Sequence, residues 1–362
     1  MRRQITNPRK GTAKTQAVTH KITIGIDIGD RWSHYCILDE EGQLVEEGRF
    51  RTIASSVGKH FQDVPVARIA IEAGTHSIWI SEQLAQYGHE VIVANVTELH
   101  AIVRNIRKSD QVDAEKLARY ARLDPNILRP ITHRSVKAQQ ELTVIRARDV
   151  LVRLRTAAVN AVRGLVKPCG VRLPSSSTSC FAKRCRVVLS EALLRALSPL
   201  LEQIEQLSEQ IKHYDRTILE MSRLSHPETQ ALQTVHGVGP LTALTYVLTL
   251  DDPRRFERSR DVGCYLGLRP RRDQSGGHDP QLGITKAGNV YLRKLLVECA
   301  NYILGPHGKD SSLRRWGLQL AGKGGKNARK RAIVAVARKL AVLLHHLWVT
   351  KSSYVPFYEA AA

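Results

Sequence analysis

The sequence lacks cysteine pairs at metal-finger spacing. None of its cysteines forms a Cys-x-x-Cys pair, and Cys180 and Cys185 lie five residues apart without a second pair nearby. A structural zinc site is built from ligands paired at closer, repeated spacings. We therefore expect no zinc, and we interpret all six cysteines as reduced thiols of a cytosolic protein: Cys36, Cys169, Cys180, Cys185, Cys264 and Cys299.

Membrane signals are missing as well. No segment has the basic-then-apolar pattern of a signal peptide, and no apolar run is expected to span a bilayer. We expect no membrane partner and a cytoplasmic, nucleoid-associated location.

Acidic residues are scarce relative to basic ones. The 362 residues include 55 Lys and Arg against 34 Asp and Glu, which gives a formal charge of +21. The isoelectric point is near 10.0. Such an excess favours a polyanionic partner. A hydrophobic content of 43% supports real cores, and the length allows two or three domains.

In this basic chain, one acid lies inside an apolar strand. Asp27 interrupts the run ITIGIDIG, and an unpaired buried carboxylate is costly. Glu72 lies in a second apolar strand, RIAIEA. Asp110 and Asp113 are three residues apart in an expected helix, where alone they would be interpreted as a solvated face. Together the four carboxylates predict a site for two Mg²⁺ or Mn²⁺ ions.

The pattern of apolar residues predicts an α/β N-terminal domain. We expect strands over 22–28, 33–38, 44–50, 68–72 and 90–94, and helices near 53–62, 76–87 and 97–123. The resulting order is three strands, helix, strand, helix, strand, helix. This is the order of a ribonuclease H-like fold.

Composition divides the chain into six segments. We expect a basic flexible arm over 1–20, a catalytic domain over 21–166, a linker over 167–187, a coiled-coil helix over 188–225, a mainly α C-terminal domain over 226–348 and a tail over 349–362. The catalytic domain ends in a basic helix, 136–166. The basic arm and this helix either contact phosphates or are simply solvated.

An apolar heptad repeat runs through residues 197–221. Its a and d positions are Leu197, Ile204, Ile211 and Ile218, and Leu200, Leu207, Tyr214 and Met221. The repeat favours intermolecular or antiparallel helix pairing. The competing interpretation is a helix packed on its own domain.

The C-terminal region carries a glycine-rich turn, VHGVGPLTA, over 235–243. The pattern is typical of a helix-hairpin-helix, in which freed backbone N–H groups hold a phosphate. An ordinary corner between two helices has the same composition.

Ser275 lies in a second glycine-rich turn, RPRRDQSGGH. Its hydroxyl could attack phosphorus and form a phosphoserine ester, with His278 or a metal-bound hydroxide as the base. Most Ser-Gly turns have a purely structural role. Basic residues around this turn and in a later cluster are expected to contact nucleic acid: Arg269, Arg271, Arg272, Lys286, Arg293, Lys323, Lys326, Arg329, Lys330 and Arg331.

The chain resembles the DEDD-type transposases of bacterial insertion sequences. The resemblance rests on GIDIG, AIEAG and RKSDQVDAEKLARY in the first half. In the second half it rests on HGVGPLTALTYV, CYLGLRPRRDQSGG and GITKAGNVYLRKLL. The N-terminal domain of that family is similar to the Holliday-junction resolvase RuvC, and the C-terminal transposase domain carries a serine.

The resemblance implies an enzyme that excises and inserts its own element. The family's four acids would be Asp27, Glu72, Asp110 and Asp113, and its serine would be Ser275, with Thr285 as a weaker candidate. It also implies a noncoding bridge RNA that pairs with target and donor DNA. Finally, it implies dimers that pair into tetramers, with the acids of one subunit acting beside the serine of another.

Three other functions fit parts of the sequence. A structure-specific nuclease would need only the acids and water. An actin-like sugar kinase shares the GIDIG strand, but later glycine-rich nucleotide loops are missing and the charge of +21 is unsuited to a small-molecule kinase. A nucleic-acid binder without enzymatic activity explains the charge but not the four acids.

Overall fold

The computed structural model describes residues 21–95, 110–278, 280 and 282–357. The chain forms two compact units, Met1–His133 and Arg134–Ala362. The expected basic arm, the start of the expected 97–123 helix and the last residues of the tail lie outside the described residues. Because the first unit ends at His133, the basic helix expected at the end of the catalytic domain belongs to the second unit.

Within its described part, the first unit contains a mixed sheet of five strands. They are β1 (Thr23–Asp27), β2 (Trp32–Leu38), β3 (Leu44–Arg51), β4 (Arg68–Glu72) and β5 (Glu90–Ala94). The sheet order is β3-β2-β1-β4-β5, antiparallel from β3 to β1 and parallel from β1 to β5. The expected order of elements is confirmed, and the strand that carries Asp27 is central.

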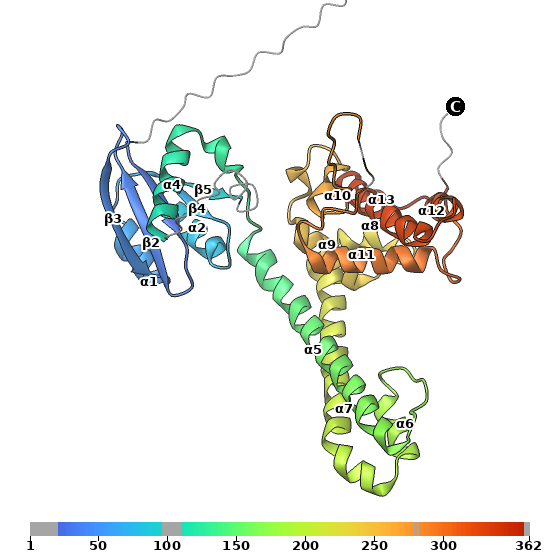
Figure 1. Cartoon of the computed structure of the whole chain (residues 1–362). Helices are drawn as coiled ribbons and strands as arrows, with labels where there is room; N and C mark the ends of the chain where they lie inside the picture. Colours follow the sequence, from blue (N-terminus) through green and yellow to red (C-terminus); the bar gives the residue numbers. More distant parts are fainter. Residues whose placement is uncertain (1–20, 96–109, 279, 281, 358–362) are drawn as a thin grey trace, which may run out of the picture. The chain divides into compact units, whose positions relative to one another are not determined.

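Helices cover both faces of this sheet (Figure 1). On one face, α1 (Ala54–Phe61) and α2 (Ser77–Gln86) enclose a core that includes Ile24 and Ile26 of β1. On the other face lies α4 (Asp110–Leu123). Alternate residues of a strand face opposite sides, so the odd-numbered residues of β1 face α4.

Gly25 allows α4 to lie directly on β1. A Cβ atom at this position would come within 2.0 Å of the Ala114 carbonyl oxygen and 2.5 Å of the Ala118 nitrogen. Only glycine permits such a close backbone approach. The helix that carries two of the predicted acids is therefore held against the strand that carries the first.

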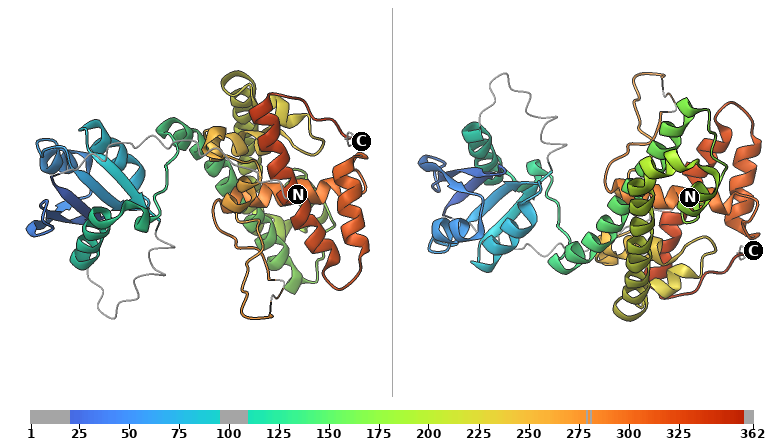
Figure 2. Two further views of the ribbon diagram at one scale, coloured as in Figure 1. Left: turned by 90° about the horizontal axis from the view of Figure 1, so that it is seen from above. Right: turned by 90° about the horizontal axis from the view of Figure 1, so that it is seen from below.

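The second unit begins with a long helical hairpin (Figures 1 and 2). In it, α5 (Val136–Val166) packs against α7 (Glu191–Glu220), with α6 (Phe181–Val188) between them in sequence. The two long helices are antiparallel, and the Arg148 guanidinium donates to the Asp215 carboxylate at 2.6 Å. The hairpin thus brings the start of α5 and the end of α7 together.

The heptad residues of α7 pack inside the chain. The four a positions are between 1% and 5% exposed. Near the tip of the hairpin, Leu197 and Ile204 pack with Val159 and Val162 of α5. At the end near the bundle, Ile218 packs with Leu142 and Ile145. The repeat is therefore used for antiparallel pairing within one chain, while pairing between copies stays a prediction.

The expected linker, 167–187, contains a helix. Residues 167–180 form a short 3-10 turn and irregular chain, but α6 starts at Phe181. Phe181, Ala182 and Cys185 are buried against α5 and α7. The Pro, Gly and Ser residues that predicted a loop stop before these three, so the loop prediction was wrong from Phe181 onward.

The remainder of the second unit is a helical bundle. Its helices are α8 (Thr229–Gln233), α9 (Pro240–Leu250), α10 (Asp261–Tyr265), α11 (Val290–Ile303), α12 (Ser312–Gly322) and α13 (Ala328–Thr350). The glycine turn at 235–243 joins α8 to α9, and Gly237 has a φ of 97°. One face of α9, with Leu244 and Leu248, packs against α5.

Helix α13 is long and apolar enough to cross a membrane, contrary to the sequence expectation. Its Val336, Leu340 and Leu344 are completely buried in the core of the bundle, where α13 packs against α11 and α12. Its apolar composition is therefore explained by packing within this unit.

Candidate active site

Two of the predicted acids lie side by side at the carboxyl edge of the sheet. Asp27 ends β1 and Glu72 ends β4. These strands are parallel and in register, with Ile26 opposite Ile71, so the two acids occupy the next paired positions. Both side chains are partly exposed.

Both acids project toward α4. Asp27 shares a face of β1 with Gly25, on which α4 rests. Glu72 shares a face of β4 with Ala70, which packs against Leu117 in α4. The acids therefore lie beneath this helix and not on the face covered by α1 and α2.

The other two acids lie in the first turn of α4. Later in the helix, the Ala121 carbonyl accepts a hydrogen bond from Arg68, the first residue of β4, at 3.3 Å. Helix α4 consequently runs from the carboxyl edge of the sheet toward its amino edge. Asp110 and Asp113 thus start at the edge where Asp27 and Glu72 end.

His34 was missed by the sequence reasoning. It lies directly opposite Asp27 in the β1–β2 pair, and its Nδ1 is 3.6 Å from the Oδ2 of Asp110. Asp113 pairs instead with Lys116, with 3.0 Å between Oδ1 and Nζ. The signal available in the sequence was a histidine two residues into the strand that follows the Asp27 turn.

The donor set suits a hard divalent cation. All four predicted ligands are carboxylates, which Mg²⁺ and Mn²⁺ prefer. Burial raises the pKa of the nearby Cys36 thiol to about 11. Among the described residues, no group of three or more His, Cys, Asp or Glu side chains is close enough to hold a metal ion.

Ser275 lies at the tip of a hairpin in the second unit. Its N–H donates to the His278 carbonyl at 3.2 Å, and the His278 N–H donates back to the Ser275 carbonyl at 3.1 Å. Gly276, with a φ of 57°, makes the tight turn possible. The serine is exposed, and the backbone pair holds His278 across from it.

Thr285, the weaker nucleophile candidate, lies at the base of the same hairpin. Its N–H donates to the Arg269 carbonyl at 2.9 Å, and one step further the Arg271 N–H donates to Gly283 at 2.9 Å. Thr285 and Ser275 are therefore at opposite ends of the hairpin.

Most of the predicted nucleic-acid contacts are exposed. This holds for Arg269, Arg271, Arg272, Lys286, Lys323, Lys326, Arg329, Lys330 and Arg331. Arg293 is different, because it is only 8% exposed and its guanidinium donates to the carbonyls of Leu266 and Ala287 at 2.9 and 2.6 Å. In this structure Arg293 joins α11 to the residues before it, and its contact with nucleic acid stays a prediction.

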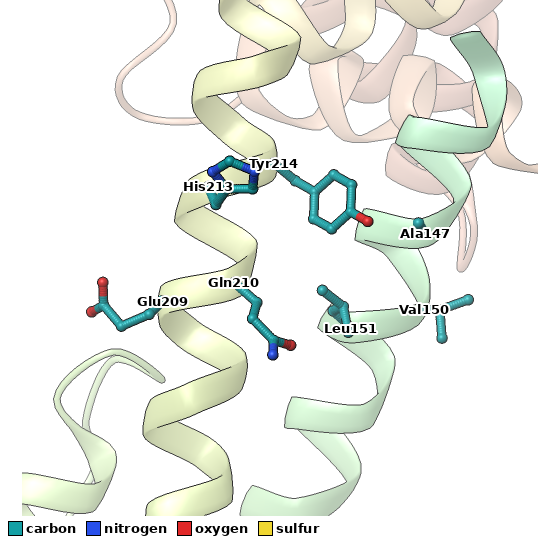
Figure 3. A pocket seen from close by; sticks show the side chains of 7 residues that line it. All are labelled: Ala147, Val150, Leu151, Glu209, Gln210, His213 and Tyr214. Atoms are coloured by element: carbon teal, nitrogen blue, oxygen red, sulfur yellow. The ribbon is translucent and has the colours of Figure 1, made fainter. Parts of the chain in front are cut away.

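A hollow of about 680 Å³ lies between α5 and α7 (Figure 3). Tyr214 and Gln210 point toward α5, while Glu209 points away from it. Its other lining residues are Ala147, Val150, Leu151 and His213. The hollow contains none of the predicted site residues, and its lining offers no converging acids for catalysis.

Comparisons with known proteins cover both units. The family model DEDD_Tnp_IS110, described as "Transposase", matches residues 24–169. The model described as "Transposase IS116/IS110/IS902 family" matches residues 229–314. The two matches include the acid residues of the first unit and the serine hairpin of the second.

Three relatives are similar over most of their lengths. The transposase for insertion sequence element IS1328 of Yersinia enterocolitica is 30% identical over 283 residues, 76% of this chain and 82% of the relative. The transposase for insertion sequence element IS1111A of Coxiella burnetii is 28% identical over 346 residues, 91% and 90% of the two chains. A probable family 20 transposase of Pseudomonas aeruginosa is 26% identical over 340 residues, 92% and 98%. The chain therefore belongs to the IS116/IS110/IS902 family of insertion-sequence transposases.

Proposed function

We propose that this transposase excises and inserts its element by metal-dependent cleavage and rejoining of DNA strands through a serine intermediate. The observation that carries the proposal is the placement of Asp27, Glu72, Asp110 and Asp113 at one edge and on one face of the sheet. In a chain of charge +21, such acids suit a metal that acts on a polyanion.

The four acids would hold Mg²⁺ or Mn²⁺ after their side chains converge, since no three of these described side chains are close enough to share an ion in this structure. The bound cations would stabilise negative charge on the phosphodiester under attack. Asp27 and Glu72 lie on adjacent rigid strands, which favours a fixed geometry for the ligands. We also propose a RuvC-like, ribonuclease H-like fold for this unit, supported by its strand order and the residues 24–169 matched by the family model.

Ser275 would be the nucleophile. Its Oγ would form a bond to phosphorus as the bond from phosphorus to the leaving sugar oxygen breaks, and the Oγ proton would pass to a base such as His278. The phosphoserine ester would conserve the energy of the cleaved phosphodiester bond. A second sugar hydroxyl can therefore displace the serine and rejoin the strands. The exposed hairpin tip supports this role because a DNA backbone can reach it.

We further propose a bridge RNA as guide and assembly into dimers and tetramers. Both proposals follow from the resemblance of the motifs to the family. The exposed basic residues around the Ser275 hairpin and before α13 would contact DNA or RNA phosphates.

One alternative is a nuclease in which water replaces the serine. It is favoured by the fact that all four acids belong to the first unit, which contains no part of the Ser275 hairpin. The two mechanisms differ in whether Ser275 is needed.

The test is junction sequencing in cells. The native locus with its flanks is placed on a plasmid, and joined element ends are counted with wild type, Ser275→Ala, Thr285→Ala and Asp27→Ala. We expect junctions with wild type and Thr285→Ala only. Junctions that persist with Ser275→Ala but vanish with Asp27→Ala would replace the serine by water, and junctions that persist with Asp27→Ala would remove the metal mechanism.

A further inference from the structure

An exposed tryptophan lies beside two arginines at the edge of the sheet. Trp32, the first residue of β2, is 41% exposed. The guanidinium carbons of Arg49 and Arg51 lie 4.9 and 5.4 Å from the centroid of its ring. Neither guanidinium forms an ion pair or hydrogen bond with another residue that the structure describes.

The arrangement places two positive charges beside one aromatic ring. Two like charges beside one ring repel each other, and each exposed cation–π contact returns only about 0.5–1 kcal/mol. A ligand that brings both negative charge and a flat apolar surface would satisfy all three side chains. A nucleotide with an unstacked base has this chemistry, since its phosphate suits Arg and its base stacks on an aromatic ring.

The three side chains lie on the same face of the sheet as Asp27. Trp32 pairs with Arg51 and His34 pairs with Arg49 across β2 and β3, so all four share one face. His34 is in turn opposite Asp27. One row of the sheet therefore runs from Asp27 through His34 to Arg49, over two strand spacings or roughly 10 Å.

Buried hydrogen bonds hold the backbone beneath this group in place. Thr52, which follows β3, donates through Oγ1 to the Gly29 carbonyl at 3.0 Å and lies 2.9 Å from the Ser33 hydroxyl. Ser33 is fully buried and Thr52 is 7% exposed. The end of β3 and the turn between β1 and β2 are thus joined, which preorganises the residues around Trp32.

We propose that Trp32, Arg49 and Arg51 form a stacking platform for the DNA strand beside the phosphate that is cut. The Trp32 ring stacks on an unpaired base, and the two arginines contact the neighbouring phosphates. That the bound strand is the one being cut rests on the proposed function of the acids. The binding itself does not, because it needs neither metal nor Ser275.

The test is binding of single-stranded DNA by the full-length protein in EDTA. The probe is a fluorescein-labelled oligothymidylate of about 16 nucleotides, the upper site size of a single-strand binding fold. Trp32→Ala should weaken binding by roughly tenfold, in line with a stacking loss of about 1–3 kcal/mol per base. Trp32→Phe should restore most of the affinity.

The arginines are tested by salt dependence. Arg49→Ala should weaken binding and reduce the slope of log K against log salt by about 0.7, the value for one phosphate contact on a single strand. Lys59→Ala is the matched control, because Lys59 is exposed on α1, over the opposite face of the sheet. It should leave both affinity and slope at the wild-type values.

Several results would overturn the platform. They are wild-type affinity for folded Trp32→Ala and Arg49→Ala, equal losses with Lys59→Ala, or tighter binding of the matching oligouridylate or of duplex DNA. If Trp32→Ala does not fold, the affinity and salt slope of Arg49→Ala decide. Because the binding assay in EDTA needs neither metal nor strand cleavage, failure of the metal mechanism in cells and failure of the platform in vitro are separate outcomes.

Discussion

The Nδ1 of His34 in β2 lies 3.6 Å from the Oδ2 of Asp110 in the first turn of α4. This contact joins the strand opposite Asp27 to the helix that carries two further acids. A neighbour that orients a metal-binding carboxylate changes metal affinity even though it is not itself a ligand.

We expect His34→Ala to reduce junction formation about tenfold and to raise the Mg²⁺ concentration needed for half-maximal cleavage. Stability should change little, because the Asp110 side chain is 66% exposed and such pairs contribute little. The measurements are a Mg²⁺ titration of purified protein and a melting curve. His213→Ala, at an exposed position on α7, serves as the control. An unchanged Mg²⁺ requirement would remove His34 from the site.

Gly25→Ala should unfold or strongly destabilise the first unit, by about 3 kcal/mol or more. The added Cβ would lie 2.0 Å from the Ala114 carbonyl oxygen, so α4 would have to move off the strand. Gly74→Ala is the matched control, since a Cβ there meets nothing within 4 Å. Urea unfolding of both variants measures the difference, and equal stabilities would contradict the close packing of α4 on β1.

Substitutions of Arg293 and Lys326 should have different effects, the first on stability and the second on DNA binding. Arg293→Ala removes one buried and one partly buried hydrogen bond to carbonyls, so we expect a loss of about 2–3 kcal/mol in unfolding free energy. Lys326→Ala, at an exposed position, should keep the melting temperature and weaken DNA binding with a smaller salt slope. The reverse result would restore Arg293 as a phosphate contact.

The cysteines should react at very different rates. Hydrogen bonds from Ser177 and Ser179 lower the pKa of the exposed Cys180 thiol, while burial raises that of Cys36 to about 11. A lower pKa gives more thiolate at a given pH, so iodoacetamide should modify Cys180 first at pH 8 and leave Cys36 unmodified in the folded protein. Mass spectrometry of a time course checks this order, with Cys180→Ser as the control.

Local pattern was enough to predict the sheet and its acids. The apolar runs around Asp27 and Glu72 have the length and composition of buried strands, which predicts both strands. That the two acids lie at one edge follows from the parallel pairing of β1 with β4 in the structure. The same GIDIG run also suited a sugar kinase. The strand itself does not decide against that interpretation; the missing nucleotide loops, the charge of +21 and the family matches over both units do.

Features that depend on register or on burial by distant segments were not predictable. His34 is opposite Asp27 only because β2 pairs in one register, and Trp32 meets Arg49 for the same reason. Arg293 is basic like its exposed neighbours, and nothing in its local sequence shows that α11 turns it inward. Phe181 follows a loop-like segment, but the hairpin buries it.

The helical hairpin formed by α5 and α7 can change in length during evolution independently of the rest of the chain. The start of α5 and the end of α7 lie together at the bundle, because Leu142 and Ile218 pack in the same cluster with α9. Along it, Arg155 lies 3.4 Å from Ser208, in the same antiparallel alignment as the Arg148–Asp215 pair nearer the bundle. A seven-residue insertion in α5 matched by one in α7 would lengthen the hairpin by about 10 Å and leave the bundle intact. Relatives can therefore differ in the length of this hairpin while the helical bundle stays the same.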